Sequence, residues 1–495
     1  MTRSKLLTCI IAMAAAASRL TAFAGANSPE LNTLRVYPVP KALYYSSHNN
    51  DFTVRVRTPG GVWHDLYEYR IRVDMNAPQN ASLVYFDFAG KVEVEVEKNN
   101  GKFDQVAVAP RSSGIKLQRK KSVVRFTLIR PERFSLQFDD DRLHNLHILA
   151  GALPAPAPQE ANLRVFGPGL HTPPEGHSTF PVLSGEHIYL EGGAVLRGSF
   201  ELSGVHDVKI SGRGFLYNPG RPIDLNGVSN IDIHDLILVN DEKSDAARIM
   251  NIRNSQNVVV RDISGFTDGK WSDGINISTS QHVSVDRGYL RVSDDAVVVY
   301  AVTDCPICGD KPIASIGPPG AAFPADTFDI HIRNLTIWND VAHSMFVGHF
   351  GDNSAPRSIH DVSFDNIDVV SLDEHNPDWE GVMAIFSGDS TLTRNIRFTN
   401  IRVDRIIEGK LINIVAGNNE RYNKAPGHGI EGIIFRNISF SGDGMPSRSI
   451  IKGLSEATAV KDVKIENLRI GGRKIRSAAE GDIDIGSFVS GLEFR

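Results

Sequence analysis

Two hydrophobic patterns divide the chain. Up to about Leu149, apolar and polar residues alternate with a period of two, in runs such as Phe52-Thr-Val-Arg-Val56 and Val92-Glu-Val-Glu-Val-Glu97, and turn residues such as Asn99-Asn-Gly101 separate the runs. Short antiparallel strands with one solvent-facing side give this pattern. We therefore expect a β-sandwich domain over residues 25–150, followed by a stiff linker rich in Pro and Ala over residues 151–161.

A repeat organises residues 162–495. Each copy has a polar residue, an apolar-x-apolar strand, an Asn or Asp five positions after that polar residue, and a second apolar-x-apolar strand, as in Asn395-Ile-Arg-Phe-Thr-Asn400-Ile-Arg-Val403. Successive copies begin 23 to 47 residues apart, and an insertion at about residues 305–324 swells the longest gap. The copies begin at Asp207, Asn230, Asn257, His282, Asp329, Asp361, Asn395, Gly432 and Asp462.

Short strands that recur at this spacing, with Asn at a fixed bend, are typical of a parallel β-helix. A leucine-rich horseshoe is the alternative with such strands, but no helical segment follows each strand here. The predicted fold class is all-β: an N-terminal β-sandwich followed by a right-handed parallel β-helix over residues 162–495. The repeat also predicts which side chains meet, because equivalent positions stack about 4.8 Å apart on successive coils.

Composition and charge narrow the function. The 495 residues are 41% hydrophobic and 22% charged, which suits a large packed core. The formal net charge of −5 disfavours a nucleic-acid-binding surface. Residues 1–24 have Arg3 and Lys5, then a short apolar run, then Ala22-Phe23-Ala24, which is the layout of a secretory signal peptide. We expect a secreted or periplasmic protein that has no membrane association after cleavage of this signal.

Two of the three cysteines lie close together outside the signal. Cys305 and Cys308 form a CxxC pair, which suits either a disulfide in an exported protein or half of a metal site. Because no second cysteine pair is present, the disulfide is the better interpretation. We predict neither a metal nor a cofactor.

Three carboxylates and an imidazole occur on three adjacent coils of the predicted β-helix. Asp273 lies 11 residues after the bend position Asp262, Asp294 and Asp295 follow the next bend, and His343 lies 9 residues after Asn334. Cleaving a glycosidic bond needs one carboxylic acid to protonate the leaving oxygen and another carboxylate to activate water. Crowding raises the pKa of a carboxyl and so keeps an acid protonated. The structural alternative is that these aspartates only cap turns.

These motifs resemble those of a known enzyme family. Ser272-Asp273-Gly-Ile-Asn276, Ser293-Asp294-Asp295 and His343-Ser-Met-Phe-Val-Gly348 are similar to the Asn-Thr-Asp, Asp-Asp and Gly-His-Gly-x-x-x-Gly blocks of the polygalacturonase family of glycoside hydrolases. A sandwich before the helix, and the helix entry Ile188-Tyr-Leu-Glu-Gly-Gly-Ala-Val-Leu-Arg-Gly-Ser-Phe200, resemble more closely the related dextranase and isopullulanase family.

The resemblance implies a role for each residue. Asp294 would be the general acid, and Asp273 with Asp295 would hold and deprotonate the water, with inversion of configuration. His343 would support the acid or orient the sugar, although Ala342 and Ser344 replace the flanking glycines of the motif.

A second departure concerns the substrate. Polygalacturonases carry an Arg-x-Lys pair one coil further on, and the corresponding segment here reads Met383-Ala-Ile385. A buried substrate carboxylate without a cation is costly, so a neutral glycan is favoured over pectin. Arg248 on the preceding coil, or Lys270, remains available as a displaced cation.

Other residues are weaker candidates for binding a carbohydrate. Trp271, Tyr300 and Trp379 flank the predicted cleft, and aromatic faces stack on sugar rings, but these residues also suit coil-end packing. His349 is a candidate polar group in a sugar subsite. Glu374 belongs to an acidic loop that we expect to be a solvated rim.

Three other functions use the same scaffold. A polysaccharide lyase would need calcium-binding carboxylates and a cationic base. A carbohydrate-binding or adhesion protein would use the acids only as turn caps. A glycosyl or fructosyl transferase would form cyclised or elongated sugars.

Overall fold

The computed structural model describes residues 32–217, 220–240, 247–303, 326–376 and 381–495. Within these ranges the protein is built from β-strands and two single-turn 3-10 helices, Lys41–Leu43 and Arg111–Ser113, and contains no α-helix. None of the helices described here is long and apolar enough to cross a membrane. The predicted signal peptide of residues 1–24, the Cys305 and Cys308 pair and Trp379 lie outside the described residues.

The strands up to Ala152 form two mainly antiparallel sheets, and the pairing of β5 with β11 is parallel. The six-stranded sheet contains β1 (Thr33–Arg35), β4 (Tyr69–Val73), β5 (Gln79–Ala89), β7 (Val106–Ala109), β10 (Glu132–Phe138) and β11 (Asp141–Ala152). The five-stranded sheet contains β2 (Phe52–Arg57), β3 (His64–Asp65), β6 (Val92–Lys98), β8 (Gln118–Lys120) and β9 (Val123–Leu128).

The alternation seen in the sequence explains the sandwich core. In β2, Phe52, Val54 and Val56 are buried and the residues between them are more exposed. Their side chains join one apolar cluster with residues of the other sheet, including Phe86 and Phe134. Burial of one apolar face from each sheet is what holds a β-sandwich together.

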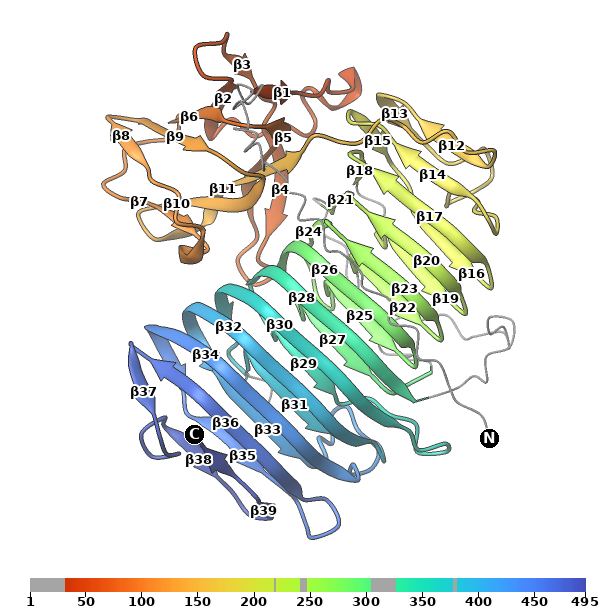
Figure 1. The fold of residues 1–495 in the computed structure, drawn as a ribbon, viewed down its shortest axis with the longest axis vertical. Helices are drawn as coiled ribbons and strands as arrows, with labels where there is room; N and C mark the ends of the chain where they lie inside the picture. The colour runs from red at the N-terminus through yellow and green to blue at the C-terminus, as the bar shows by residue number, and fades with distance from the viewer. Residues whose placement is uncertain (1–31, 218–219, 241–246, 304–325, 377–380) are drawn as a thin grey trace, which may run out of the picture. The chain divides into compact units, whose positions relative to one another are not determined.

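The strands from Leu163 onward pair in parallel from coil to coil, as Figure 1 shows, apart from Arg473–Ile475, which pairs antiparallel with Val460–Ile470. A ten-stranded sheet contains β16 (Phe200–Ser203), β19 (Ile223–Asn226), β22 (Met250–Arg253), β25 (Ile275–Ser278), β27 (Val297–Tyr300), β29 (Met345–Gly348), β31 (Met383–Ser387), β33 (Ile412–Ala416), β35 (Ser449–Lys452) and β38 (Ile483–Ile485). These coils form the predicted right-handed parallel β-helix.

The remaining strands form one nineteen-stranded sheet. Its strands are β12 (Leu163–Phe166), β13 (Gly169–His171), β14 (His187–Leu190), β15 (Ala194–Leu196), β17 (His206–Gly212), β18 (Phe215–Tyr217), β20 (Ser229–His234), β21 (Ile237–Val239), β23 (Gln256–Arg261), β24 (Ser264–Phe266), β26 (Gln281–Val292), β28 (Thr327–Asn339), β30 (Ser358–Asp373), β32 (Leu392–Lys410), β34 (Gly429–Ser447), β36 (Val460–Ile470), β37 (Arg473–Ile475), β39 (Val489–Ser490) and β40 (Glu493–Phe494).

Both polar positions of the sequence repeat adopt the left-handed backbone conformation. At the first position φ lies between 55° and 57°, and Gly432 has a φ of 69°. At the bend position φ lies between 54° and 65° in eight copies, and Gly212, at the bend of the first copy, has a φ of 116°. Asn, Asp and Gly tolerate this region best, which explains the composition of the repeat. The bend residues are Asp235, Asp262, Arg287, Asn334, Asn366, Asn400, Asn437 and Asn467.

Side-chain amides at the bends form a ladder of hydrogen bonds between coils. The amide nitrogen of Asn437 donates to Oδ1 of Asn400 at 3.0 Å, and Asn467 donates in turn to Oδ1 of Asn437 at 3.0 Å. Arg287 replaces the amide on its coil and bonds to both carboxylate oxygens of Asp262. Asn334 and Asn400 donate instead to the aspartate just before the preceding bend, Asp286 and Asp365. These bonds hold the coils that they join in register.

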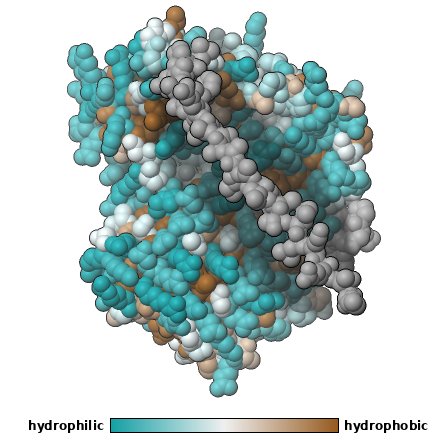
Figure 2. All heavy atoms as spheres, viewed as in Figure 1, coloured by the Kyte–Doolittle hydropathy of each residue, from teal (hydrophilic) through white to brown (hydrophobic). Residues whose placement is uncertain are grey.

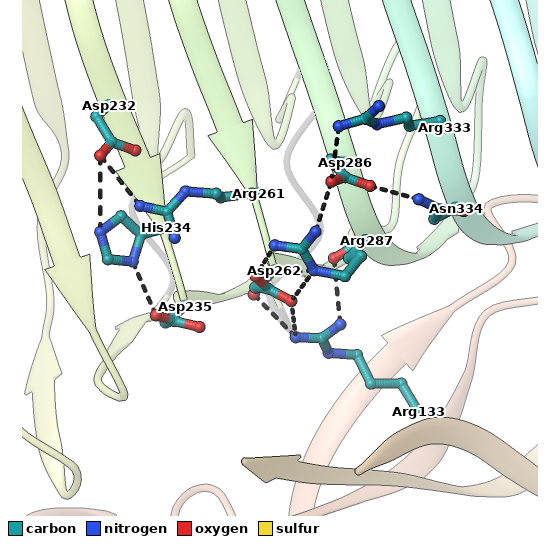
Figure 3. A network of polar contacts seen from close by, with 10 residues as sticks. All are labelled: Arg133, Asp232, His234, Asp235, Arg261, Asp262, Asp286, Arg287, Arg333 and Asn334. Carbon is teal, nitrogen blue, oxygen red and sulfur yellow. Dashed lines mark hydrogen bonds and ion pairs between the residues drawn. The ribbon is translucent and has the colours of Figure 1, made fainter. Parts of the chain in front are cut away.

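The sandwich packs on the β-helix through aromatic rings and buried charges. Tyr69 stacks on Phe215 with ring centroids 4.7 Å apart. Arg213 on the helix forms a buried salt bridge of 2.8 Å with Asp87 on β5. Figure 3 shows Arg133 of β10 reaching the bend ladder, where it donates to the carbonyl oxygens of Asp262 and Arg287, each at 3.1 Å.

The described surface is mostly polar. Hydrophilic side chains cover much of the face in Figure 2, and large exposed apolar side chains such as Tyr45 and Met445 are few. The apolar residues instead fill the interior of the coils, where Ile, Leu, Val and Phe side chains from successive coils form one continuous cluster. The helix is therefore stabilised as a stack in which each coil covers the next.

The ladder gives a testable expectation for stability. Asn437→Val places a β-branched residue in the left-handed region and removes two inter-coil hydrogen bonds, so we expect the free energy of unfolding to fall by about 2 kcal/mol. Asn437→Gly relieves the backbone strain and is expected to lose less. Urea denaturation measures both, with Ser439→Val on an extended part of the same strand as the control. Equal losses for Gly and Val would contradict backbone strain as the cause.

Candidate active site

Four polar side chains stack in one column on consecutive coils. Arg248, Asp273, Asp295 and His343 each lie two residues before a strand residue of the ten-stranded sheet. Those strand residues pair side by side across β22, β25, β27 and β29, in the order Met250, Ile275, Val297 and Met345. Asp294 precedes Asp295 on the third of these coils. The register therefore brings together the residues that the sequence predicted.

Local hydrogen bonds shape the turns that carry this column. Oγ1 of Thr267 donates to the carbonyl oxygen of Ser272 at 2.7 Å, which closes the turn before Asp273. The amide of Asn339 donates to the carbonyl oxygen of Asp294 at 2.9 Å and ties two turns together. Ala342 has a φ of 66°, a conformation that suits the glycine expected from the motif.

Asp273 is a buried carboxylate held by a cation. Its Oδ2 accepts hydrogen bonds from Nε of Arg248 at 3.0 Å and from the amide of Asn276 at 2.7 Å. Burial raises the pKa of Asp273 to about 6, and the charge of Asp295 adds to this rise while Arg248 opposes it. Asp273 is therefore an acid whose charge changes near neutral pH.

Asp294 is a carboxyl shifted toward its protonated form. Burial raises its pKa well above the usual value, and the charges of Asp273 and Asp295 raise it further. Its Oδ2 accepts a hydrogen bond from the backbone N–H of Trp271 at 2.8 Å, and its Oδ1 from the backbone N–H of Asp295 at 3.0 Å. These two donors fix the orientation of the carboxyl but do not offset the burial.

Asp295 and His343 form a pair across two coils. Oδ1 of Asp295 accepts hydrogen bonds from the backbone N–H of His343 at 3.0 Å and from its ring Nδ1 at 2.7 Å. Because the carboxylate oxygen of Asp295 accepts this hydrogen bond, the ring proton of His343 is on Nδ1. The imidazole stacks on Phe346 with ring centroids 4.2 Å apart, so its plane is fixed as well.

The three carboxylates converge on one point. One oxygen from each of Asp273, Asp294 and Asp295 lies within 4.8 Å of the other two. A second group of side chains, Asp373, His375 and Glu408, also has ligand-type atoms within 4.8 Å of one another. Either group has atoms that a cation accepts as ligands, but in the first group Arg248 and backbone N–H donors already contact the oxygens.

The converging carboxylates open into a cavity of about 430 Å³. All of the predicted site residues line it, except Trp379, which lies outside the described residues. Trp271 is 46% exposed and Tyr300 only 6%, so Trp271 is open to solvent and Tyr300 is a buried part of the wall. The predicted residues on the wall are Arg248, Lys270, Trp271, Asp273, Asp294, Asp295, Tyr300, His343 and His349.

His349 belongs to an aromatic group at one end of the cavity. Its ring lies against Phe350 with centroids 3.7 Å apart and meets Tyr422 edge-on at 5.4 Å. Burial lowers the pKa of His349 to about 3, so the ring is neutral at physiological pH. This end of the cavity is suited to the apolar face of a ligand.

Sequence reasoning missed several wall residues. Glu374, expected on a solvated rim, is only 8% exposed and lines the cavity, and burial raises its pKa. Arg421 and Tyr422 come from a loop two coils beyond His343, and Met75 and Asn76 come from the sandwich. No repeat or motif marks these four positions in the sequence. They lie far along the chain from the coils that carry Asp273, Asp295 and His343, so counting positions on those coils could not find them.

The structure also corrects the prediction for Met383-Ala-Ile385, the segment compared with the Arg-x-Lys pair of polygalacturonases. Met383 and Ile385 point into the core of the helix, where they are 0% and 1% exposed. The outward positions of β31 are Ala384 and Phe386, which pack with Tyr300 and Phe346. Side chains of a strand alternate between its two faces. The sequence analysis took Met383 and Ile385 as the outward residues, whereas the outward face carries Ala384 and Phe386. The outward pair is uncharged like the predicted one.

Solved structures resemble the chain over most of its length. Dex49A from Penicillium minioluteum has a TM-score of 0.54 at 14% identity, covering 90% of this chain and 94% of that chain. The family 28 exopolygalacturonase of Yersinia enterocolitica has a TM-score of 0.47 at 11% identity, covering 81% and 96%. The exopolygalacturonase of Thermotoga maritima has a TM-score of 0.40 at 14% identity, covering 63% and 85%. The first likeness supports the fold.

A family model matches a large part of the chain. No curated protein matches the sequence. The model for glycosyl hydrolases family 28 matches residues 200–481, a range that contains the whole column of polar side chains. This range exceeds half of the chain. The protein belongs to glycosyl hydrolases family 28.

Proposed function

We propose that the protein is an inverting glycoside hydrolase whose site consists of Asp273, Asp294, Asp295 and His343. The observation that carries this proposal is the convergence of three carboxylates, within 4.8 Å of one another, at the wall of a cavity that also has aromatic surfaces. A glycosidic bond needs a proton donor on one side and an activated water on the other. The two differently shifted carboxyls suit these two tasks.

Asp294 is the proposed general acid. It keeps its proton near neutral pH because burial and two neighbouring carboxylates raise its pKa. Its two backbone hydrogen bonds hold the carboxyl in one orientation. When the bond between the sugar ring and the leaving oxygen breaks, the proton of Asp294 moves to that oxygen, and Asp294 is left as a carboxylate.

Asp273 and Asp295 are the proposed holders of the water. Arg248 favours the ionised form of Asp273, and His343 donates to Asp295. A water bound between two carboxylates donates one hydrogen to each and directs a lone pair at the anomeric carbon. One carboxylate takes a proton as the bond forms. His343 acts by orienting Asp295.

A neutral poly- or oligosaccharide is the proposed substrate, such as a dextran-like α-glucan. The outward positions of β31 are uncharged, and Arg248 is engaged with Asp273. A substrate carboxylate on this strand would lie beside Phe386 and Ala384, and leaving such a charge unpaired is costly.

A polygalacturonase-type pectin hydrolase is the second candidate. Lys270 and Arg421 line the same cavity, and cations there suit an acidic sugar. The family match is consistent with either substrate. The two candidates differ in the sugar and share the chemistry of the site.

Export and domain organisation complete the proposal. The arrangement of residues 1–24 supports secretion or periplasmic export. The change of sheet type between Ala152 and Leu163 supports a division into a sandwich domain, a linker over residues 151–161 and a catalytic helix. A Cys305–Cys308 disulfide is part of the same proposal, since exported proteins keep such bonds.

The substrate class and the acid are tested together. Reducing-sugar release is measured for dextran, pullulan, arabinan and polygalacturonate with the wild type and with Asp294→Asn. We expect release from a neutral glycan and a loss of about 10² to 10⁴-fold in the variant, because the amide cannot donate a proton of suitable acidity. Asp484→Asn, on the exposed end of the helix, is the matched control.

Other outcomes of this panel separate the alternatives. Release from polygalacturonate alone would select the pectin hydrolase. An unsaturated product that absorbs in the ultraviolet would identify a lyase, and elongated or cyclised sugars would identify a transferase. Glycan binding without any product would leave a binding protein.

The pH profile tests the assignment of the two carboxyls. As pH falls through about 6, Asp273 becomes protonated and stops accepting the proton of water, so activity is expected to fall. At high pH, Asp294 loses its proton and activity falls again. Arg248→Met removes the charge that lowers the pKa of Asp273, so the acidic limb of kcat/KM should move to higher pH.

Two controls accompany this measurement. Arg261→Met, on a different sheet and paired with Asp232, should leave the limb in place. Thermal unfolding of both variants establishes that they are folded at the assay temperature. An acidic limb that does not move in folded Arg248→Met would remove Asp273 from the proposed role.

The stereochemistry of the product tests inversion directly. Proton NMR of the first anomer released is expected to show the configuration opposite to that of the substrate. Retaining enzymes typically have carboxyl groups about 5 to 5.5 Å apart and inverting enzymes about 6.5 to 9.5 Å. The spacing within 4.8 Å here, between one oxygen of each aspartate, is closer to the retaining geometry. The proposal of inversion rests on the family resemblance of the motifs, so this measurement decides between the two outcomes. Release of the retained anomer would contradict inversion, and Asp273 or Asp295 would then be assigned as a nucleophile.

A further inference from the structure

The geometry points to a role of the sandwich in catalysis: its loop Asp74–Pro78, between β4 and β5, forms a wall of the catalytic cavity, and Met75 and Asn76 determine how the glycan binds. This inference rests on the proposed function and adds specificity-determining residues to it. The sandwich is then part of the active site rather than a separate module.

The two loop residues differ in chemistry. Met75 is partly buried, and Asn76 is exposed. Both line the cavity, as do Glu374, His375 and Asn376 from the β-helix. A carboxamide has a donor and an acceptor, which suits sugar hydroxyls, and a thioether side chain packs against the apolar face of a sugar ring.

Asp74 fixes the conformation of this loop. It is 1% exposed and has a φ of 64°. Its Oδ1 accepts hydrogen bonds from the backbone N–H groups of Asn76 and Ala77, each at 2.9 Å. Its own backbone N–H donates to Oδ2 of Asp340 on the β-helix at 3.0 Å. The loop is thus closed on itself and attached to the helix.

Two arginines extend this attachment. Nη1 of Arg142 lies 2.6 Å from Oδ2 of Asp74, and Nη2 of the same side chain lies 3.0 Å from Oδ2 of Asp373. Arg291, whose side chain is fully buried, pairs with Asp340 at 2.9 Å and also donates to Asn145 of the sandwich at 2.9 Å. Charges buried in this way hold their partners in place, since separating them is costly.

The same network reaches the turns that carry cavity residues. Asp340 lies three residues before His343, and Asp373 lies immediately before Glu374. The loop, the histidine turn and the Glu374 turn are therefore positioned by one set of ion pairs. A wall held this firmly is preorganised to contact a ligand, which lowers the entropy lost on binding.

Single substitutions in the loop test the inference. Asn76→Ala and Met75→Ala are compared with Gln79→Ala, which removes an exposed side chain three residues further along that does not line the cavity. The glycan that the wild type cleaves best is used for KM, kcat and the distribution of product lengths. Calorimetry with an oligosaccharide of that glycan gives Kd in the Asp294→Asn background.

We expect each wall variant to raise KM and Kd by about fivefold, the loss of one hydrogen bond or its apolar equivalent, and to change the product lengths. Gln79→Ala should match the wild type. Wall variants that match Gln79→Ala in every readout, in an active enzyme, would overturn the inference and leave the proposed function standing.

A different result would affect the proposed function. If the wild type cleaves no glycan in the panel but binds one, the hydrolase proposal fails, and weaker binding by Asn76→Ala than by Gln79→Ala still supports the wall. If the wild type neither cleaves nor binds any of them, both proposals fail. Thermal unfolding of each variant shows that a change in Kd does not come from loss of structure.

Discussion

The left-handed bend on each coil is the constraint on which the rest of the structure depends. Asn and Asp adopt this conformation at low cost, and the amides of the asparagines link one coil to the next. Differences in coil length are consequently absorbed between the strands. The longest gap between repeats precedes Asp329, yet β27 and β29 on either side of it still pair in register. Asp295 and His343, 48 residues apart, therefore meet at 2.7 Å.

Stacking in register also explains the electrostatics of the candidate site. Elsewhere in the helix, equivalent positions on successive coils carry amides that donate to one another, and stacking there is favourable. The site column is a separate position of the coil, where Asp273 and Asp295 lie on adjacent coils, so stacking there brings like charges together in a buried place. One arginine, Arg248, neutralises one of them. The remaining charge is reduced most easily by keeping a proton on Asp294, so the unusual pKa follows from the architecture of the coils.

The sequence predicts those features that depend on the repeat. The bends, the strands and the column of Asp273, Asp295 and His343 all follow from positions counted along one coil and carried to the next. Two kinds of error arise where counting is not enough. The face of β31 depends on where its strand begins, which the alternation of Met383 and Ile385 with Ala384 and Phe386 leaves ambiguous because all four are apolar or small. Contacts between distant elements, such as that of Asp74 with Asp340 across 266 positions, have no periodic signal at all.

Buried ion pairs make the sandwich and the helix energetically interdependent. Arg213 with Asp87, Arg291 with Asp340, and Arg142 with both Asp74 and Asp373 either cross between the two or hold residues that do. Each of these pairs has at least one partner that is almost completely buried. Removing one partner of such a pair while the contact stays closed would leave a buried charge uncompensated, which is strongly destabilising. The turns before His343 and Glu374 are anchored by these charges, so the shape of the cavity is set by contacts on both sides.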